Sequence, residues 1–441
     1  MGKNRLSLVI AFLLLVPTLT WASGFGVFTQ GAAGLGQANA VVAHPVGPSS
    51  VYFNPALLPD ISGKQIEIGT TLISADRSVD LDAGGTQDIC SHYDYPSTLY
   101  YTHQVTEDFS FGLGVFFPFG LSTEWDDTYT GRYLGTLGDI VTTNINPVFA
   151  YRVNDQWSIS VGATAMKLDA ELEKKINQTA AYIITDLQLS GGVGGALPPL
   201  GSPLPDINQR FEGDGWGYGF NVGLLYKPFN KVSMGFTYRS HVDIQVEGKA
   251  SFTNVTPILA AGFTDTGGDA DIRLPAQATA GVAYQFLDAL VIECGARWED
   301  WSSTEELKIS LKNPVFGQTS DTIPRDWKST WSYMVGADYQ LTNHLSLRGG
   351  YLFGENAVPS STFEPLVPDS DAHLITVGLG WQVANWTIDS AFGYEYHESR
   401  SKSNSLGDPL GSVLAGSSVS TANGDYKSEI FLFGLSVAYN F

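Results

Sequence analysis

The sequence predicts an all-β fold, a transmembrane antiparallel β-barrel of about fourteen strands with an N-terminal hatch (plug) inside its lumen. Three observations predict it. Apolar and polar residues alternate with period two in many segments, the connections between those segments are alternately short and long, and the stretch before the first strand is rich in glycine and proline. Short periplasmic turns that alternate with long extracellular loops are typical of outer-membrane barrels, and an even strand count places both chain ends on the periplasmic side.

Residues 1–22 are predicted to be a signal peptide. Lys3 and Arg5 precede an apolar run over residues 6–16, and small residues indicate cleavage after Ala22. The apolar run is too short to span a bilayer core of about 30 Å as a helix, which disfavours the alternative of an N-terminal membrane anchor. No later segment offers about 18 consecutive apolar residues, so the mature chain is expected to have no transmembrane helix.

Residues 23–62 are predicted to form the hatch. Glycines at positions 24, 26, 31, 34 and 36 make this stretch too flexible for a stable helix. Prolines at positions 45, 48, 55 and 59 exclude it from the middle of a sheet. Alone it could not bury enough apolar surface to fold, so we expect the barrel to enclose it.

Residues 63–441 are predicted to form the barrel. In the last strand, Phe433 and Leu435 share an apolar face, whereas Gly434 and Ser436 share the opposite face, which fits lipid outside and a polar lumen inside. The terminal Phe441 resembles the signal that outer-membrane assembly machinery recognises. The predicted strands cover residues 64–79, 95–105, 109–125, 140–153, 157–176, 213–227, 232–252, 271–286, 289–303, 326–341, 345–354, 372–383, 386–397 and 426–441.

The composition argues against several classes of function. A formal net charge of −21 disfavours a nucleic-acid partner, which requires a basic face, and an aromatic content of 12 % disfavours disorder. Two cysteines do not make a disulfide framework. The chain has no His-Glu-x-x-His, Gly-x-Ser-x-Gly or Cys-x-x-Cys motif, and its 7 histidines are scattered. We therefore predict no metal, no cofactor and no enzymatic activity.

Motifs along the mature chain give it a resemblance to a known family. Gly34-Leu35-Gly36 and Asn54-Pro55-Ala56 lie in the predicted hatch, and Phe119-Gly120-Leu121 and Phe236-Thr237-Tyr238-Arg239-Ser240 lie in the predicted barrel. With these motifs the sequence resembles the FadL family of outer-membrane long-chain fatty acid and hydrocarbon transporters. The resemblance implies a monomeric channel in the outer membrane of a Gram-negative bacterium. Such a channel captures hydrophobic small molecules outside the cell and releases them sideways into the membrane lipid through a gap in its wall.

The third predicted strand carries the predicted lateral opening. Pro118 cannot donate a hydrogen bond to a neighbouring strand, and Gly120 within a strand suggests a bulge. An ordinary structural bulge is the alternative that these residues alone leave open. In the family this strand kinks inward, so the resemblance implies that the opening lies at Phe117, Pro118, Phe119 and Gly120.

The start of the hatch is predicted to gate the channel. Ser23, Gly24 and Phe25 match the family's hatch start, where the terminal segment lies against the buried ligand site. Phe25 supplies an apolar plug between flexible glycines, so a ligand that competes with it would open the channel. We expect only Asn54-Pro55-Ala56 and the first strand to hold the hatch to the wall. The alternative is that Phe25 is a static hydrophobic anchor.

Ligand contacts are predicted from the chemistry of a fatty acid, which needs an apolar slot and a cation for its carboxylate. By the resemblance, Lys174 and Lys308 align with basic residues near the family's ligand site; alternatively they are solvated or face lipid head groups. The loops over residues 177–212 and 253–270 are unusually apolar, which favours capture there, unless they pack on each other as a lid. The loop residues assigned to ligand contact are Leu189, Leu197, Ile258 and Phe263.

The predicted function is therefore passive uptake of a hydrophobic molecule across the outer membrane. Two alternatives remain, a general porin for polar solutes and an outer-membrane lipid hydrolase. A porin would conduct steadily in planar bilayers, whereas a plugged transporter would conduct little. The substrate, a long-chain fatty acid or an aromatic hydrocarbon, stays open.

Overall fold

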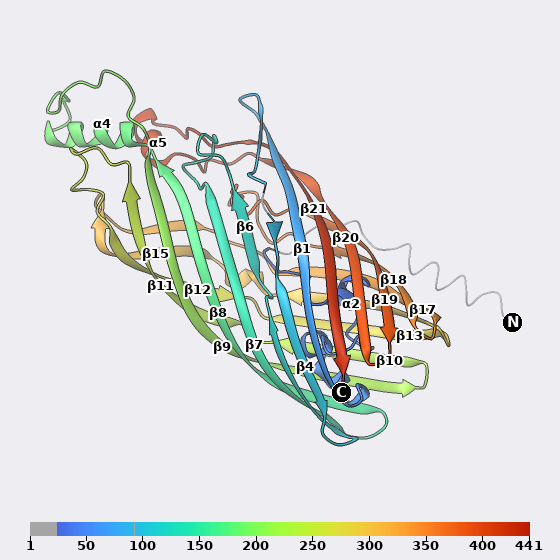
Figure 1. Ribbon diagram of the computed structural model, residues 1–441. Helices are drawn as coiled ribbons and strands as arrows, with labels where there is room; N and C mark the ends of the chain where they lie inside the picture. Colours follow the sequence, from blue (N-terminus) through green and yellow to red (C-terminus); the bar gives the residue numbers. More distant parts are fainter. Residues whose placement is uncertain (1–23, 92) are drawn as a thin grey trace.

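The computed structural model describes residues 24–91 and 93–441 and shows a closed antiparallel β-barrel (Figure 1). Its strand segments join into 14 wall strands. The first and last strands close the barrel, because β1 (Lys64–Leu81) pairs with β21 (Gly424–Asn440) along its length. The predicted barrel is thereby confirmed. The predicted signal peptide, residues 1–22, and the predicted gating residue Ser23 lie outside the described residues.

Between β1 and β21, consecutive wall strands pair with one another in chain order, and several of them are divided by a short break. The undivided strands are β4 (Ser97–Gln104), β7 (Leu137–Arg152), β8 (Trp157–Ile176), β9 (Ile207–Phe229), β18 (Leu345–Gly354), β19 (Ala372–Val383) and β20 (Trp386–Lys402). The divided strands are β5 (Phe109–Phe116) with β6 (Gly120–Glu124), β10 (Val232–Arg239) with β11 (Val242–Thr253), β13 (Gln277–Leu287) with β12 (Thr266–Leu274), β14 (Leu290–Glu299) with β15 (Glu306–Val315), and β17 (Thr330–Thr342) with β16 (Gln318–Pro324). The short β2 (Thr86–Asp88) and β3 (Tyr93–Asp94) also pair with β1.

The two faces of the wall follow the period-two pattern. In β19 the outward side chains of Ile375 and Val377 are 55 % and 56 % exposed, whereas Thr376 between them is buried. In β21 Leu435 is exposed and Ser436 is buried. Apolar side chains thus cover the outer face, where lipid would contact them, and small or polar side chains face the lumen.

The N-terminal segment over residues 24–62, here called the hatch, lies inside the barrel. It contains two one-turn helices, α2 (Ala32–Leu35) and α3 (Ser50–Phe53), and the 3-10 helix η1 (Pro55–Asp60). Figure 1 shows these turns as blue coils enclosed by the wall. The glycine content predicts no stable helix in this segment. The two α-helices that form are single turns of four residues, and all of these residues are buried. Enclosure, rather than helix propensity, stabilises them.

Polar side chains of the wall bind the hatch backbone. The Glu293 carboxylate accepts hydrogen bonds from the Val42 and Ala43 amides at 2.6 and 3.0 Å. Its second oxygen lies 2.7 Å from His44 Nδ1. Further contacts come from other strands, since Ser436 accepts from the Ala32 amide, Thr376 accepts from the Ala38 amide and Tyr100 donates to the Gln30 carbonyl. The expectation that only Asn54-Pro55-Ala56 and the first strand hold the hatch is therefore wrong.

Glycines on the inner face of the wall allow this close packing. A Cβ atom placed on Gly350 of β18 would lie 2.4 Å from the Gln37 carbonyl carbon. A Cβ atom on the adjacent Gly349 would have Thr376 O, at 3.8 Å, as its nearest neighbour. A side chain at position 350 would point toward the hatch, whereas one at position 349 would not. The hatch therefore requires glycine only at position 350.

Two helices lie in the extracellular loops, where no helix was predicted. The helix α4 (Gln178–Leu189) follows β8, and α5 (Pro409–Ala415) lies between β20 and β21. The Asn177 side chain accepts from the Ala180 amide and caps α4, and the Asp408 side chain caps α5. Asn177 Nδ2 also donates to Asp408 Oδ2 at 2.6 Å, which joins the two helix starts. No helix in the described ranges is long and apolar enough to cross a membrane.

The glycine pair provides a test of the hatch packing. We expect Gly350→Ala to displace the hatch, because the added methyl group meets backbone atoms that cannot rotate away. The variant should raise single-channel conductance in planar bilayers while heat-modifiable migration on gels shows a folded barrel. Gly349→Ala is the matched control and should conduct like the unmodified protein. Equal conductance in the two variants would contradict the packing.

Candidate functional site

The third wall strand is interrupted where the lateral opening was predicted. β5 ends at Phe116 and β6 begins at Gly120, so residues 117–119 leave the regular ladder. β5 pairs with both β4 and β7, whereas β6, among the described strands, pairs only with β7. Pro118 contributes to the break because it has no amide hydrogen to offer a neighbour. One edge of β6 therefore has no neighbouring strand among the described residues, although its Glu124 carbonyl accepts from the Cys90 amide at 2.8 Å.

The start of the hatch occupies the interruption. Gly26 forms an isolated antiparallel bridge with Phe119. The Val27 amide donates to the Pro118 carbonyl at 2.9 Å, and the Gly120 amide donates to the Phe25 carbonyl at 3.0 Å. These contacts satisfy backbone groups that the broken strand would otherwise leave without a partner.

A cavity of ≈ 330 Å³ lies beside this junction. Its size falls within the range of about 300–1,000 Å³ that is usual for small-molecule sites. Tyr95, which is 64 % exposed, also lines it, so the cavity borders the exposed surface of the protein. The apolar lining comes from the hatch, from β1 and from strands on either side of the break: Phe25, Val27, Phe28, Ile73, Phe119, Leu121, Ile140, Ile430 and Leu432.

Phe25 packs into a cluster of aromatic rings. Its ring centroid lies 4.7 Å from Trp301, 5.8 Å from Trp327 and 6.2 Å from Phe119, in edge-to-face arrangements. Trp301 is fully buried. Gly24 precedes this contact with a φ of +59°, and a Cβ atom there would lie 2.7 Å from the Trp301 ring, so no other residue fits without strain. Sequence reasoning missed both tryptophans, because nothing in their local pattern indicates proximity to Phe25.

The Asp369 carboxylate binds the backbone of Gly24, the first residue of the hatch that the structure describes. Asp369 lies in the loop between β18 and β19, and its Oδ2 atom accepts from the Gly24 amide at 3.0 Å and the Ala357 amide at 2.8 Å. Burial raises the pKa of this carboxyl to about 6, although both amide hydrogen bonds and the nearby His397 and Arg400 lower it. The group therefore titrates within the range in which bacteria live.

Charged residues also line the cavity. The Arg77 guanidinium donates to Thr123 Oγ1 at 2.7 Å and to the Ser122 carbonyl at 3.2 Å. Glu395 lies 2.8 Å from His397, and both line the same space. Sequence reasoning did not select Arg77, although its period-two position in β1, on the same face as Glu67 and Thr71, is a signal that could have found it.

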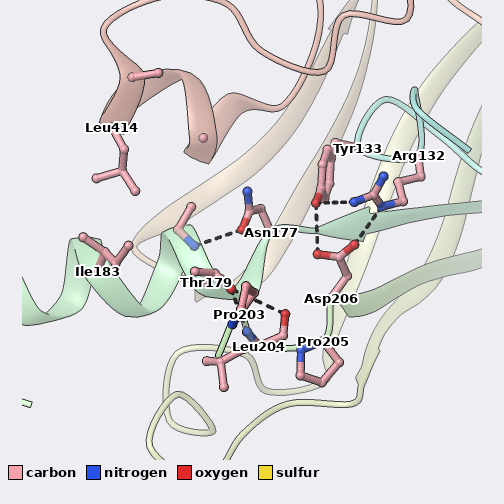
Figure 2. A pocket seen from close by; sticks show the side chains of 13 residues that line it. Arg132, Tyr133, Asn177, Thr179, Ile183, Pro203, Leu204, Pro205, Asp206 and Leu414 are labelled. Carbon is pink, nitrogen blue, oxygen red and sulfur yellow. Dashed lines mark hydrogen bonds and ion pairs between the residues drawn. The ribbon is translucent and has the colours of Figure 1, made fainter. Parts of the chain in front are cut away.

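An open groove of ≈ 670 Å³ lies on the extracellular side, between α4, α5 and the loop before β9. Figure 2 shows three apolar residues around this groove: Ile183 of α4, Leu414 of α5, and Leu204 of the loop before β9. Arg132, Tyr133 and Asp206 are grouped at one side of it. Arg132 Nε donates to Asp206 Oδ2 at 2.8 Å. The groove thus combines apolar walls with a fixed ion pair.

The predicted loop contacts divide into two groups. Leu197 and Phe263 join one apolar cluster in which the loops pack together, and Phe263 stacks on Phe316 with ring centroids 5.1 Å apart. Leu189 and Ile258 are 66 % and 46 % exposed. The extracellular loops therefore pack on each other through Leu197 and Phe263, and they also expose the apolar side chains of Leu189 and Ile258.

The predicted lysines lie away from the cavity beside Phe25. Lys174 Nζ pairs with Asp321 at 2.6 Å, and Lys308 of β15 is exposed between the buried Leu307 and Ile309. Neither lines the cavity. Ligand contact by these two residues stays a prediction.

Asn54 joins the hatch to the wall, as its predicted role requires. Its side-chain oxygen accepts from the Ala56 amide, and its Nδ2 donates to the Val42 carbonyl at 2.8 Å and to Leu224 O of β9 at 3.2 Å. Pro55 and Ala56 begin the buried η1 helix. Within the described residues, no group of three or more His, Cys, Asp or Glu side chains could hold a metal ion.

A closed barrel with an apolar outer face, a lumen filled by the N-terminal segment and a side cavity defines a plugged outer-membrane channel. The family model described as "Outer membrane protein transport protein (OMPP1/FadL/TodX)" matches residues 13–441, and the chain belongs to this family. The predicted resemblance and the outer-membrane location are confirmed.

Relatives match over most of their length. The chain is 25 % identical to the Long-chain fatty acid transport protein of Salmonella typhi over 416 residues, which covers 90 % of this chain and 92 % of the relative. It is 25 % identical over 478 residues to Outer membrane protein P1 of Haemophilus influenzae, with full coverage of both. Among solved structures, a Pseudomonas aeruginosa FadL homologue superposes with a TM-score of 0.81 at 22 % identity, covering 95 % of this chain and 100 % of the other. The P. putida toluene transporter TodX gives a TM-score of 0.69 at 17 % identity, covering 95 % and 99 %.

The Asp369 contact predicts a pH dependence of the hatch start. Burial raises the pKa of Asp369, whereas the Gly24 hydrogen bond lowers it. We expect the carboxyl to stay buried against Ala357 when only the start of the hatch moves, so loss of the Gly24 bond should raise its pKa in the displaced state. The bound state is therefore favoured above that pKa and loses this advantage as pH falls through about 6.

We expect a nitroxide at Val27→Cys to show more mobile signal at pH 5 than at pH 8. The change should be roughly tenfold in the equilibrium, because a hydrogen bond to a charged carboxylate contributes about 1.5 kcal/mol. Asp369→Asn keeps an acceptor oxygen but does not titrate, so it is the control and should give a flat profile. A pH response that persists in this variant would assign the effect to another group.

Proposed function

We propose that this protein takes up hydrophobic small molecules passively, by capture at the extracellular groove, passage to the cavity beside Phe25 and release sideways at the break in the third strand. The observation that carries the proposal is that the start of the hatch borders one cavity with the edge of β6 that has no neighbouring strand among the described residues. Displacement of a few hatch residues would therefore expose both a binding space and a gap in the wall.

The energetics of that displacement are modest. The backbone contacts to Pro118 and Gly120 are ordinary hydrogen bonds, each worth about 1 kcal/mol net. The Phe25 side chain occupies an apolar, aromatic site that an apolar ligand could fill in its place. A ligand that binds this site better than Phe25 does would shift the equilibrium toward the open state.

The groove between α4 and α5 supports the capture step. It presents Ile183, Leu204 and Leu414 to the outside, and the exposed Leu189 and Ile258 extend the apolar loop surface. Exposed apolar surface of this kind marks interaction sites. The Asn177–Asp408 contact fixes the two helices relative to each other, so the groove is preformed.

Long-chain fatty acids are the proposed substrate class, because relatives that match about nine tenths of the chain are fatty acid transport proteins. Arg77 lines the cavity and could receive a carboxylate, with Lys174 and Lys308 as proposed contacts farther along the path. Aromatic hydrocarbons are the second candidate. The ring cluster of Phe25, Phe119 and Trp301 favours them, since aromatic side chains stack well on aromatic ligands.

An uptake panel separates these candidates. Cells with and without the gene should differ in uptake of labelled oleate if fatty acids are carried, and of labelled toluene if aromatics are carried. A difference for neither compound, together with steady conductance in planar bilayers, would support a porin for polar solutes.

The lateral opening is tested by restoring the ladder. Pro118→Val supplies an amide and, like Gly120→Val, favours a straight strand, so we expect a fall in uptake. One added hydrogen bond of about 1 kcal/mol corresponds to roughly a fivefold fall. Pro147→Val is the matched control, because Pro147 lies opposite Leu113 in the continuous ladder between β5 and β7, outside the break at residues 117–119. Uptake at the original rate in both variants at 118 and 120 would place the exit elsewhere.

The gating role of the hatch start is tested by cross-linking. Gly26 and Phe119 form a bridge pair, so Gly26→Cys with Phe119→Cys should form a disulfide in a chain whose native cysteines are serines. Uptake should stop in the oxidised form and return on reduction, while each single variant transports in both conditions. Unimpaired uptake in the oxidised form would show that the segment is a static anchor.

A further inference from the structure

A second, smaller cavity lies between the hatch and the opposite part of the wall. Its volume is ≈ 30 Å³, and it is lined by Arg239 of β10, Arg297 of β14, Met334 of β17 and the hatch residues Phe28 and Tyr52. A space of more than about 10–15 Å³ can hold a water molecule, so an ion of similar size also fits. Phe28 lines both this cavity and the larger one beside Phe25.

The charges around this space do not balance. The cavity lining includes two arginines and, in the described chain, no carboxylate. Arg297 NH2 pairs with Glu299 at 3.0 Å, so its charge has a partner. Arg239 forms no ion pair with any described residue, and its hydrogen bonds within the described chain go to neutral acceptors: Asn146 Oδ1 at 3.1 Å, Val51 O at 3.4 Å and Tyr52 O at 2.6 Å. One positive charge is therefore left without a counter-ion.

A donor atom is also left without an acceptor. Arg297 is 6 % exposed, and its Nε atom has no hydrogen-bond partner among the described residues. A buried donor without a partner costs about 1–3 kcal/mol, and more when it belongs to a charged group. Water could accept the hydrogen bond, but it would not neutralise Arg239. An anion would do both.

We propose that this cavity binds a small monovalent anion, a halide or a carboxylate group, between Arg239 and Arg297. Planar guanidinium groups suit both ligands, because each offers several N–H donors to a compact negative charge. The anion would also strengthen the attachment of the hatch, since Arg239 already binds the last carbonyls of α3. This proposal does not depend on the transported substrate.

Bromide diffraction tests the site directly. Crystals of the full chain grown in sodium bromide should show an anomalous peak within hydrogen-bonding distance of both guanidinium groups. The peak should be lost in Arg239→Gln and in Arg297→Gln. Arg273→Gln is the matched control, because Arg273 pairs with Asp243 on the exposed face, and the peak should remain. Absence of the peak in the unmodified protein, or its persistence in both cavity variants, would overturn the proposal.

A thermal measurement tests the same site in solution. At constant ionic strength, replacing isethionate, a bulkier anion, with chloride should raise the unfolding temperature along a saturable curve. Arg239→Gln should abolish this rise, and an equal rise in that variant would contradict the site. If Arg239→Gln does not fold, the bromide map of the unmodified protein decides by itself.

Two competitors distinguish the sources of the anion. Loss of the bromide peak with dodecanoate but not with dodecanol would assign the site to the carboxylate of an amphiphile. Loss with formate alone would assign it to a small ion held while the hatch is closed. Either result supports an anion site. None of these measurements involves uptake, so the anion site can fail or hold independently of the transport proposal.

Discussion

The constraint on which this structure depends is that backbone amides in lipid have no water to bond. A sheet can cross a bilayer only if its edges are paired, which the β1–β21 ladder achieves by closing the barrel. The interruption at residues 117–119 is a local departure from that rule. It persists because the hatch start supplies backbone partners, through Val27 and Phe25, to the broken strand. The wall is thus complete only while the N-terminal segment stays in place.

The hatch is attached in two chemically different ways. Its body is held by polar contacts from several strands, including the Glu293 carboxylate that accepts from Val42 and Ala43. Its start is held by an aromatic cluster around Phe25 and by one buried carboxyl, Asp369. The proposed apolar ligand would compete with the aromatic contacts of Phe25 and not with the polar contacts that hold the hatch body. Binding would therefore free the start of the hatch and leave its body as a fixed plug.

Two helices of the extracellular loops are joined at their first residues. Asn177 and Asp408 each cap a loop helix and bond to each other, although they are 231 residues apart in the chain. Apolar loop residues, among them Leu197 and Phe263, pack beneath this level and support it. These contacts support the shape of the groove between α4 and α5, as the proposed capture role requires.

Local sequence patterns were sufficient to predict the barrel, its strand number and its two faces. Period-two alternation, visible in Ile375, Thr376 and Val377, depends only on neighbouring residues, and Pro118 marks the strand break by its own covalent structure. Tertiary structure alone decided which residues surround Phe25, because Trp301 of the 3-10 helix η2 (Trp301–Ser303) and Trp327 of the loop between β16 and β17 reach it from distant parts of the chain. It also decided that Lys308 faces outward on β15, and that Arg239 and Arg297 share one cavity. The register of strands far apart in the chain sets such contacts, and a local pattern carries no information about them.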